Sequence, residues 1–154
     1  MRRLLLTLAL LMAAPWASAQ PAVKILNLTA QWCPNCHILN PRLAEALTDF
    51  SEDEATRIDL DMTDARGAAR PARLAELATT AEQHKAGPVW AAYGGGTGLA
   101  ALIASDNGEL LSCLTPAKSV QDMRIQIRHA VILAQKGRPG ARMPDGVDCP
   151  RAFN

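Results

Sequence analysis

Short apolar runs and amphipathic stretches alternate along most of this chain, and the pattern predicts a mixed α/β domain. Residues 23–29 (V-K-I-L-N-L-T) are rich in apolar and β-branched side chains and have the length of a strand. Residues 37–50 carry leucines and a phenylalanine at helical spacing. Residues 56–62 alternate between apolar and polar side chains, which predicts a half-exposed strand at the edge of a sheet.

The next two predicted elements are helices, over residues 71–85 and 87–93. Pro88 suits a first helical position, because proline has no backbone N–H to leave unpaired there. A run of glycines within residues 94–98 ends the second helix. We expect this run to be a flexible connector.

A β-hairpin and a last helix complete the predicted domain. Residues 99–105 and 109–114 are apolar runs that flank Asp-Asn-Gly, which is a strong hairpin signal. Ser119 with an aspartate three residues later is typical of a helix start, and apolar residues then recur on one face. From Gly137 the chain is rich in proline and glycine, which predicts an irregular tail over residues 137–154.

The N-terminal segment differs from the rest of the chain. Arg2 and Arg3 are followed by an apolar stretch over residues 4–12, and residues 17–19 (A-S-A) are a small-residue cleavage signature. We therefore expect residues 1–19 to be a signal peptide, cleaved near Ala19, that exports the protein to the periplasm. The apolar stretch falls short of the roughly 20 residues of a spanning helix, and an uncleaved anchor is the alternative.

Composition and charge narrow the class of protein. The chain has 154 residues, of which 49% are hydrophobic and 20% charged, as is ordinary for a globular protein with one domain, here residues 20–136. Without Arg2 and Arg3, the 16 basic residues fall to 14 against 15 acidic ones, a net charge of about −1. Neither nucleic acid nor an anionic membrane is indicated as a partner.

The strongest chemical signal is W-C-P-N-C at residues 32–36, between the first predicted strand and the first predicted helix. This position places Cys33 at a helix N-terminus, where unpaired backbone N–H groups and the helix dipole favour the thiolate. Pro34 suits the first helical turn. Cys36 lies one turn further on the same side and could resolve a mixed disulfide formed by Cys33.

An exported protein meets an oxidising compartment, so all four cysteines are candidates for disulfides. The motif favours pairing of Cys33 with Cys36, which leaves Cys113 and Cys149 as a structural disulfide. That link would tie the C-terminal tail to the domain and contribute about 3 to 4 kcal/mol in the chain-entropy model. The alternative is that Cys113 and Cys149 are reduced, or form a second redox pair with the first.

The order of elements and the position of the motif resemble the thioredoxin superfamily over residues 23–135. The most specific residues are the run 32–36 and Pro41, since thioredoxins also carry a proline five residues after the second cysteine. The resemblance implies an α/β, thioredoxin-like fold, with a central mixed sheet flanked by helices and a C-terminal β-hairpin and helix. It also implies thiol–disulfide exchange, with Cys33 as the attacking thiolate and Cys36 as the resolving thiol.

The resemblance further implies an active-site surface beside the thiols, formed by Trp32, Pro34 and Asn35. Two positions depart from the family pattern. Asn27 stands where thioredoxins have a buried acid, and the family's cis-proline position falls on Gly98 or Leu99. The residues between the cysteines, Pro-Asn, also differ from the Gly-Pro of thioredoxins, and this pair tunes the redox potential.

Two functional hypotheses follow. The first is an exported thiol–disulfide oxidoreductase that exchanges disulfides with protein thiols or disulfides through Cys33 and Cys36, with a membrane electron donor or acceptor as a further candidate partner. The alternative is a thioredoxin-like module that binds or delivers a soft metal such as Cu(I) through the same cysteines, with His37 as a further candidate ligand.

No resident cofactor or metal is indicated by the remaining residues. Asp59, Asp61 and Asp64 lack the ligand pattern and the turn glycine of a calcium loop, so we expect exposed strand and turn carboxylates. Trp90 and Tyr93 are expected to be packing residues.

Overall fold

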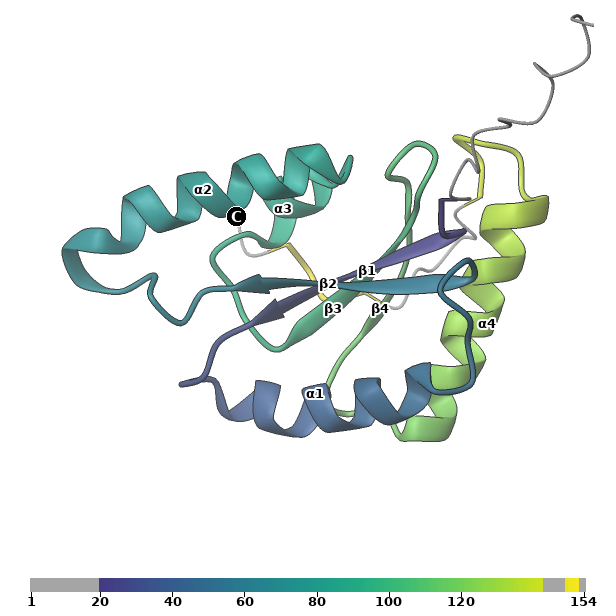
Figure 1. Ribbon diagram of the computed structural model, residues 1–154, viewed down its shortest axis with the longest axis horizontal. Coiled ribbons are helices and arrows are strands. Elements are labelled where there is room, and N and C mark those ends of the chain that lie inside the picture. The colour runs from purple at the N-terminus through teal and green to yellow at the C-terminus, as the bar shows by residue number, and fades with distance from the viewer. Residues whose placement is uncertain (1–19, 143–148, 153–154) are drawn as a thin grey trace, which may run out of the picture.

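A mixed four-stranded sheet forms the centre of the protein (Figure 1). The computed structural model describes residues 20–142 and 149–152, and the expected signal peptide lies outside them. The strand order is β2-β1-β3-β4, with β1 parallel to β2, and β3 antiparallel to both β1 and β4. The strands are β1 (Val23–Thr29), β2 (Ala55–Asp61), β3 (Leu99–Ala104) and β4 (Leu110–Leu114).

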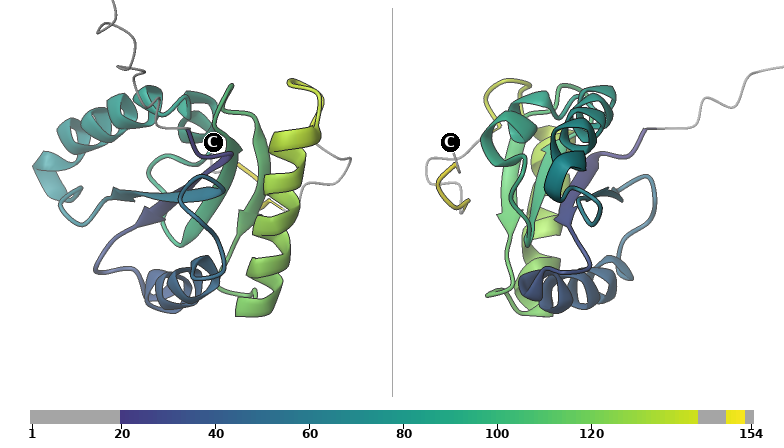
Figure 2. Two further views of the ribbon diagram at one scale, coloured as in Figure 1. Left: turned by 45° about the vertical axis from the view of Figure 1, so that its right-hand side comes forward. Right: turned by 90° about the vertical axis from the view of Figure 1, so that its left-hand side faces the viewer.

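Helices cover both faces of this sheet, as the views in Figures 1 and 2 show. One face packs against α1 and α4, and the other against α2 and α3. A short 3-10 helix, η1, precedes α2. The helices are α1 (Pro34–Leu47), η1 (Gly67–Ala69), α2 (Arg70–Gln83), α3 (Gly87–Tyr93) and α4 (Val120–Lys136). None of the helices in the described ranges has the length and apolar character needed to cross a membrane.

The central strands are buried on both faces, which explains their near-continuous apolar sequence. In β1, Val23 and Ile25 belong to the core beneath α1 and α4, whereas Leu26 and Leu28 belong to the core beneath α2 and α3. Asn27 lies between them and is also fully buried. A polar side chain in this position requires hydrogen-bond partners.

Most element boundaries agree with the sequence prediction to within one or two residues, and β2 is an edge strand as predicted. Ser119 and Asp122 form the expected capping box at the start of α4. The largest difference is at the end of α1, which stops at Leu47 rather than at residue 50. Its start agrees with the predicted position of the motif, because Cys33 caps the helix and Pro34 is its first residue.

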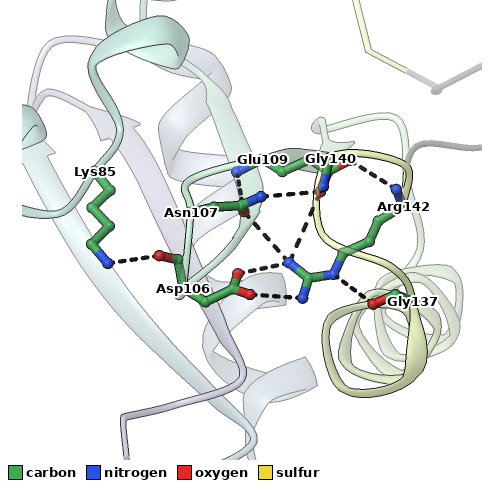
Figure 3. A network of polar contacts seen from close by, with 7 residues as sticks. All are labelled: Lys85, Asp106, Asn107, Glu109, Gly137, Gly140 and Arg142. Carbon is green, nitrogen blue, oxygen red and sulfur yellow. Dashed lines mark hydrogen bonds and ion pairs between the residues drawn. The ribbon is translucent and has the colours of Figure 1, made fainter.

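The described part of the C-terminal tail contains no helix or strand, yet side chains bind it to the domain. The guanidinium of Arg142 forms two hydrogen bonds, of 2.6 and 2.7 Å, with the carboxylate of Asp106 in the hairpin turn (Figure 3). The carboxylate of Glu109 accepts hydrogen bonds from the backbone N–H groups of Gly140 and Arg142. Only 4% of the Arg142 side chain is exposed, so the pairing satisfies a buried charge.

A second attachment lies further along the tail. Cys149 forms a disulfide with Cys113 in β4, with 4.9 Å between their Cα atoms. The hydroxyl of Tyr93 in α3 donates to the backbone carbonyl of Pro150 at 3.0 Å. The tail is thus joined to the sheet edge and to a helix on the same face.

Candidate functional site

Cys33 and Cys36 lie where the chain leaves β1 and enters α1. Cys33 is the N-cap residue of α1, with an extended backbone, and Cys36 lies in the first turn of the helix. The two sulfurs form a disulfide, and the Cα atoms are 5.2 Å apart. Both residues are nearly enclosed, with exposed fractions of 3% for Cys33 and 2% for Cys36.

The two sulfurs have different surroundings. The backbone N–H of Cys36 donates to the Sγ of Cys33 at 3.1 Å. This contact, together with the positive end of the helix dipole, stabilises negative charge on Cys33 after reduction. The Sγ of Cys36 instead lies 3.9 Å from the carbonyl oxygen of Leu28, which disfavours negative charge. Cys33 is therefore the sulfur better suited to become a nucleophile.

An exposed surface surrounds this buried pair. Trp32 is 40% exposed, and its indole N–H donates to the carbonyl of Thr63 at 3.1 Å. The guanidinium of Arg66 lies 4.7 Å from the centre of the indole ring, at cation-π distance. Pro34 and Asn35 are also exposed. The structure therefore places the three predicted surface residues next to the disulfide, and it adds Arg66, which has no marked signal in the sequence.

The glycine-rich connector before β3 approaches the motif at Gly98. Its φ is +81°, and a Cβ atom built at this position would lie 2.7 Å from the Cβ of Asn35. The N–H of Gly98 donates to the carbonyl of Leu28, the same oxygen that lies near Cys36. Glycine is required here by both the backbone conformation and the close approach. The described residues contain no cis peptide bond.

A polar network lies beneath the start of α1. The amide nitrogen of Asn27 donates to Asp59 at 2.7 Å and to the side-chain oxygen of Asn40 at 2.9 Å. The amide nitrogen of Asn40 in turn donates to the hydroxyl of Thr29 at 3.0 Å. Arg57 forms a 2.7 Å ion pair with Asp59. Asn27 is thereby held as a donor, and its own side-chain oxygen has no hydrogen-bond partner among the described residues.

This network borders an open pocket of about 300 Å³ beside Cys36. The pocket joins the first turns of α1 to the ends of β1 and β2. His37 lies at its rim, with the ring Nε2 at 2.9 Å from the carbonyl of Gln31. The lining residues are Thr29, Ala30, Gln31, Cys36, His37, Asn40, Arg57, Asp59 and Asp61.

The sequence prediction did not place Cys36 and Asp59 beside the same pocket. Part of this arrangement is local, because Cys36 and Asn40 are four residues apart and share a face of α1. The rest of the arrangement depends on strand pairing, since Asn27 lies opposite Asp59 in the parallel register of β1 and β2. Among the described residues, no three or more His, Cys, Asp or Glu side chains gather as metal ligands.

No protein-family model matches the chain, and a search of curated proteins finds no significant match.

Proposed function

We propose that this protein is an exported thiol–disulfide oxidoreductase with a thioredoxin-like fold. The observation that carries the proposal is the Cys33–Cys36 disulfide at the N-terminus of α1, with a backbone N–H bound to the Sγ of Cys33. A sulfur in this environment is readily present as a thiolate, which acts both as a nucleophile and as a leaving group in disulfide exchange. Cys36, three residues away, is within bonding reach of it.

The arrangement of elements supports the fold assignment. The first strand leads directly into the helix that bears both cysteines, and a parallel strand, two helices, an antiparallel hairpin and a last helix follow. This order matches the resemblance found in the sequence. Pro41 lies inside α1, at the position where thioredoxins have their helix proline.

In the proposed reaction, the Cys33 thiolate attacks one sulfur of a client disulfide. A bond forms between Cys33 and that sulfur, the client disulfide breaks, and the other client sulfur leaves as a thiolate that takes up a proton. Cys36 then loses its proton and attacks Cys33. This step forms the Cys33–Cys36 disulfide and releases the second client sulfur, so that the protein loses two electrons and the client gains them. The reverse sequence would oxidise a client dithiol.

The proposed partners are protein thiols or disulfides, and a membrane donor or acceptor could return the protein to its starting redox state. Trp32, Pro34 and Asn35 form the exposed surface that a client would meet first. Periplasmic location remains part of the proposal and rests on the N-terminal sequence. Mass measurement of the protein isolated from the periplasm would detect cleavage near Ala19.

Reaction with glutathione disulfide tests the proposal. The reduced protein should consume the reagent and release two glutathione molecules per protein. Cys33→Ala should abolish the reaction at this site, whereas Cys36→Ala should stop at a mixed disulfide on Cys33, visible by mass spectrometry. A double Cys113→Ala/Cys149→Ala variant serves as the control and should still react. Unchanged exchange in Cys33→Ala would disprove the proposal.

A further inference from the structure

The resolving step of the proposed reaction requires Cys36 to lose a proton inside the protein. Cys36 is only 2% exposed, and burial disfavours the charged thiolate. The carbonyl of Leu28 near its sulfur adds to this cost. The proton therefore needs an acceptor that can be reached from Cys36.

The pocket beside Cys36 offers three titratable side chains. His37 comes from α1, and Asp59 and Asp61 come from β2, whereas β1 contributes only uncharged side chains to the lining. The one cation in the lining is Arg57, which is paired with Asp59. The candidates are therefore few, and their existing hydrogen bonds distinguish them.

Asp61 and His37 are already engaged at the pocket rim. One carboxylate oxygen of Asp61 accepts from both the backbone N–H and the hydroxyl of Thr63. The Nε2 of His37 faces the carbonyl of Gln31. These contacts direct the ring of His37 toward a backbone carbonyl and one carboxylate oxygen of Asp61 toward Thr63.

Asp59 differs from both in its connection to the helix that bears Cys36. Its Oδ1 accepts hydrogen bonds from Asn27 and Arg57, and within the described ranges its Oδ2, like that of Asp61, makes no hydrogen bond. Asn27 also binds Asn40, which lies one helical turn after Cys36 on the same helix face. The carboxylate is thus fixed on one side by a buried amide and is open on the other.

We propose, on the basis of the oxidoreductase function, that Asp59 accepts the Cys36 proton through water in this pocket, with Asn27 and Asn40 fixing its position. The polar lining and the volume of about 300 Å³ suit such water. The acid that assists the resolving thiol would thus stand on β2, opposite Asn27.

The proposed step is balanced within the reaction. The Cys36 S–H bond breaks, the proton passes through water to Oδ2 of Asp59, and the Cys36 thiolate attacks Cys33. The bond between Cys33 and the client breaks as the Cys33–Cys36 bond forms. The departing client thiolate receives a proton from solvent, and Asp59 returns its own proton to solvent because about half of its side chain is exposed.

The two steps can be timed separately with glutathione disulfide as the probe. Rapid quenching and mass spectrometry follow the mixed disulfide on Cys33, which the first step forms and the second removes. In Asp59→Asn we expect the second step to slow about tenfold at neutral pH, while the first step is unchanged. The difference should disappear at alkaline pH, where Cys36 ionises without help.

Matched variants distinguish proton acceptance by Asp59 from the effect of losing a negative charge and from the effect of altered packing. Asp64→Asn removes the same charge from an exposed position outside the pocket and should leave both steps unchanged. Asp59→Glu should restore part of the rate. If Asp59→Asn fails to fold, Asp59→Gln supplies a second neutral side chain for the same measurement.

Three results would overturn the proposal. They are an unchanged second step in Asp59→Asn, an equal slowing in Asp64→Asn, or a slowing in Asp59→Asn that persists at alkaline pH. Failure of the oxidoreductase function itself looks different, because the wild-type protein would then form no mixed disulfide on Cys33.

Discussion

Asn27 donates its amide hydrogen to Asp59 across the parallel pair of β1 and β2, at 2.7 Å. This contact joins a fully buried amide to a carboxylate that reaches solvent. The neutral partner matters, because two carboxylates at this distance could not both be ionised at low cost.

The first prediction therefore concerns Asn27→Asp. The new carboxylate would lie beside Asp59, so one of the pair should hold a proton in the folded state, with its pKa raised by the other charge. A raised folded-state pKa means that stability is lost as the pH rises through that value. We expect a loss of about 1–3 kcal/mol at neutral pH, which shrinks on acidification.

Urea unfolding at neutral and at mildly acidic pH measures this effect. Asn27→Ser is a suitable control, because it shortens the side chain without adding a charge. Equal stability of Asn27→Asp and the wild type at both pH values would contradict the prediction.

The second prediction concerns the disulfide between Cys113 and Cys149, which are 36 residues apart in the sequence. Closing a loop of this length reduces the entropy of the unfolded chain. Replacing both cysteines by alanine should lower the free energy of unfolding by about 3 to 4 kcal/mol in the chain-entropy model. Guanidinium unfolding checks the value, and peptide mapping under non-reducing conditions checks the pairing.

A third prediction concerns the Arg142 clasp, which comprises Arg142, Asp106 and Glu109. The hydrogen bonds from Arg142 hold the pKa of the Asp106 carboxyl below its ordinary value. Burial of Glu109 opposes its ionisation, but the N–H groups of Arg142 and Gly140 outweigh this effect and lower its pKa as well. The stabilisation is present above the usual carboxyl range and is lost as the pH falls through the lowered values.

Arg142→Ala should therefore destabilise the protein by about 1–3 kcal/mol at neutral pH, and the difference from the wild type should narrow in acid. Hydrogen exchange of residues 137–142, measured at both pH values, should show faster exchange in the variant. Arg138→Ala provides the control, since it removes the same charge from an exposed position in the same segment. Equal effects of the two substitutions would argue against the clasp.

A fourth prediction compares two glycines of the connector before β3. Gly95 and Gly98 both have positive φ, but a side chain at Gly98 would strike Asn35, whereas the nearest atom to a Cβ at Gly95 is 3.6 Å away. Gly95→Ala should cost about 1 kcal/mol for its backbone conformation alone.

Gly98→Ala should cost more than Gly95→Ala and should also change the reactivity of the motif, because Asn35 lies between the two cysteines. Thermal unfolding gives the first comparison. The rate of Cys33 alkylation after reduction gives the second. Equal unfolding temperatures and equal alkylation rates in the two variants would show that the approach of Gly98 to Asn35 affects neither stability nor reactivity.

The elements of this fold could be predicted because each has a local signal. Alternation marks the edge strand β2, and the Ser119 capping box marks the start of α4. The position of the motif between β1 and α1 could likewise be predicted, because both elements have their own periodicity. The start of α1 at Cys33 followed from the motif and from Pro34, whereas apolar spacing placed the end of this helix three residues too late.

The polar contacts around the site could not be predicted in the same way. Asn27 and Asp59 are 32 residues apart, and only the register of two parallel strands brings them together. Arg142 stands in a proline- and glycine-rich segment, and its burial depends on the hairpin turn folding beside it. Such contacts follow from tertiary packing, which local sequence patterns do not encode.

The buried end of the Cys113–Cys149 bond has a consequence for the proposed disulfide exchange. Under that proposal, the Cys113–Cys149 bond of every other copy of the chain is a competing substrate. Cys113 is 0% exposed, so its sulfur cannot be approached directly. Attack on Cys149 would have to expel the Cys113 thiolate into an apolar core, which is costly. Burial of Cys113 in the core thus protects the Cys113–Cys149 disulfide from reduction by other copies of the protein.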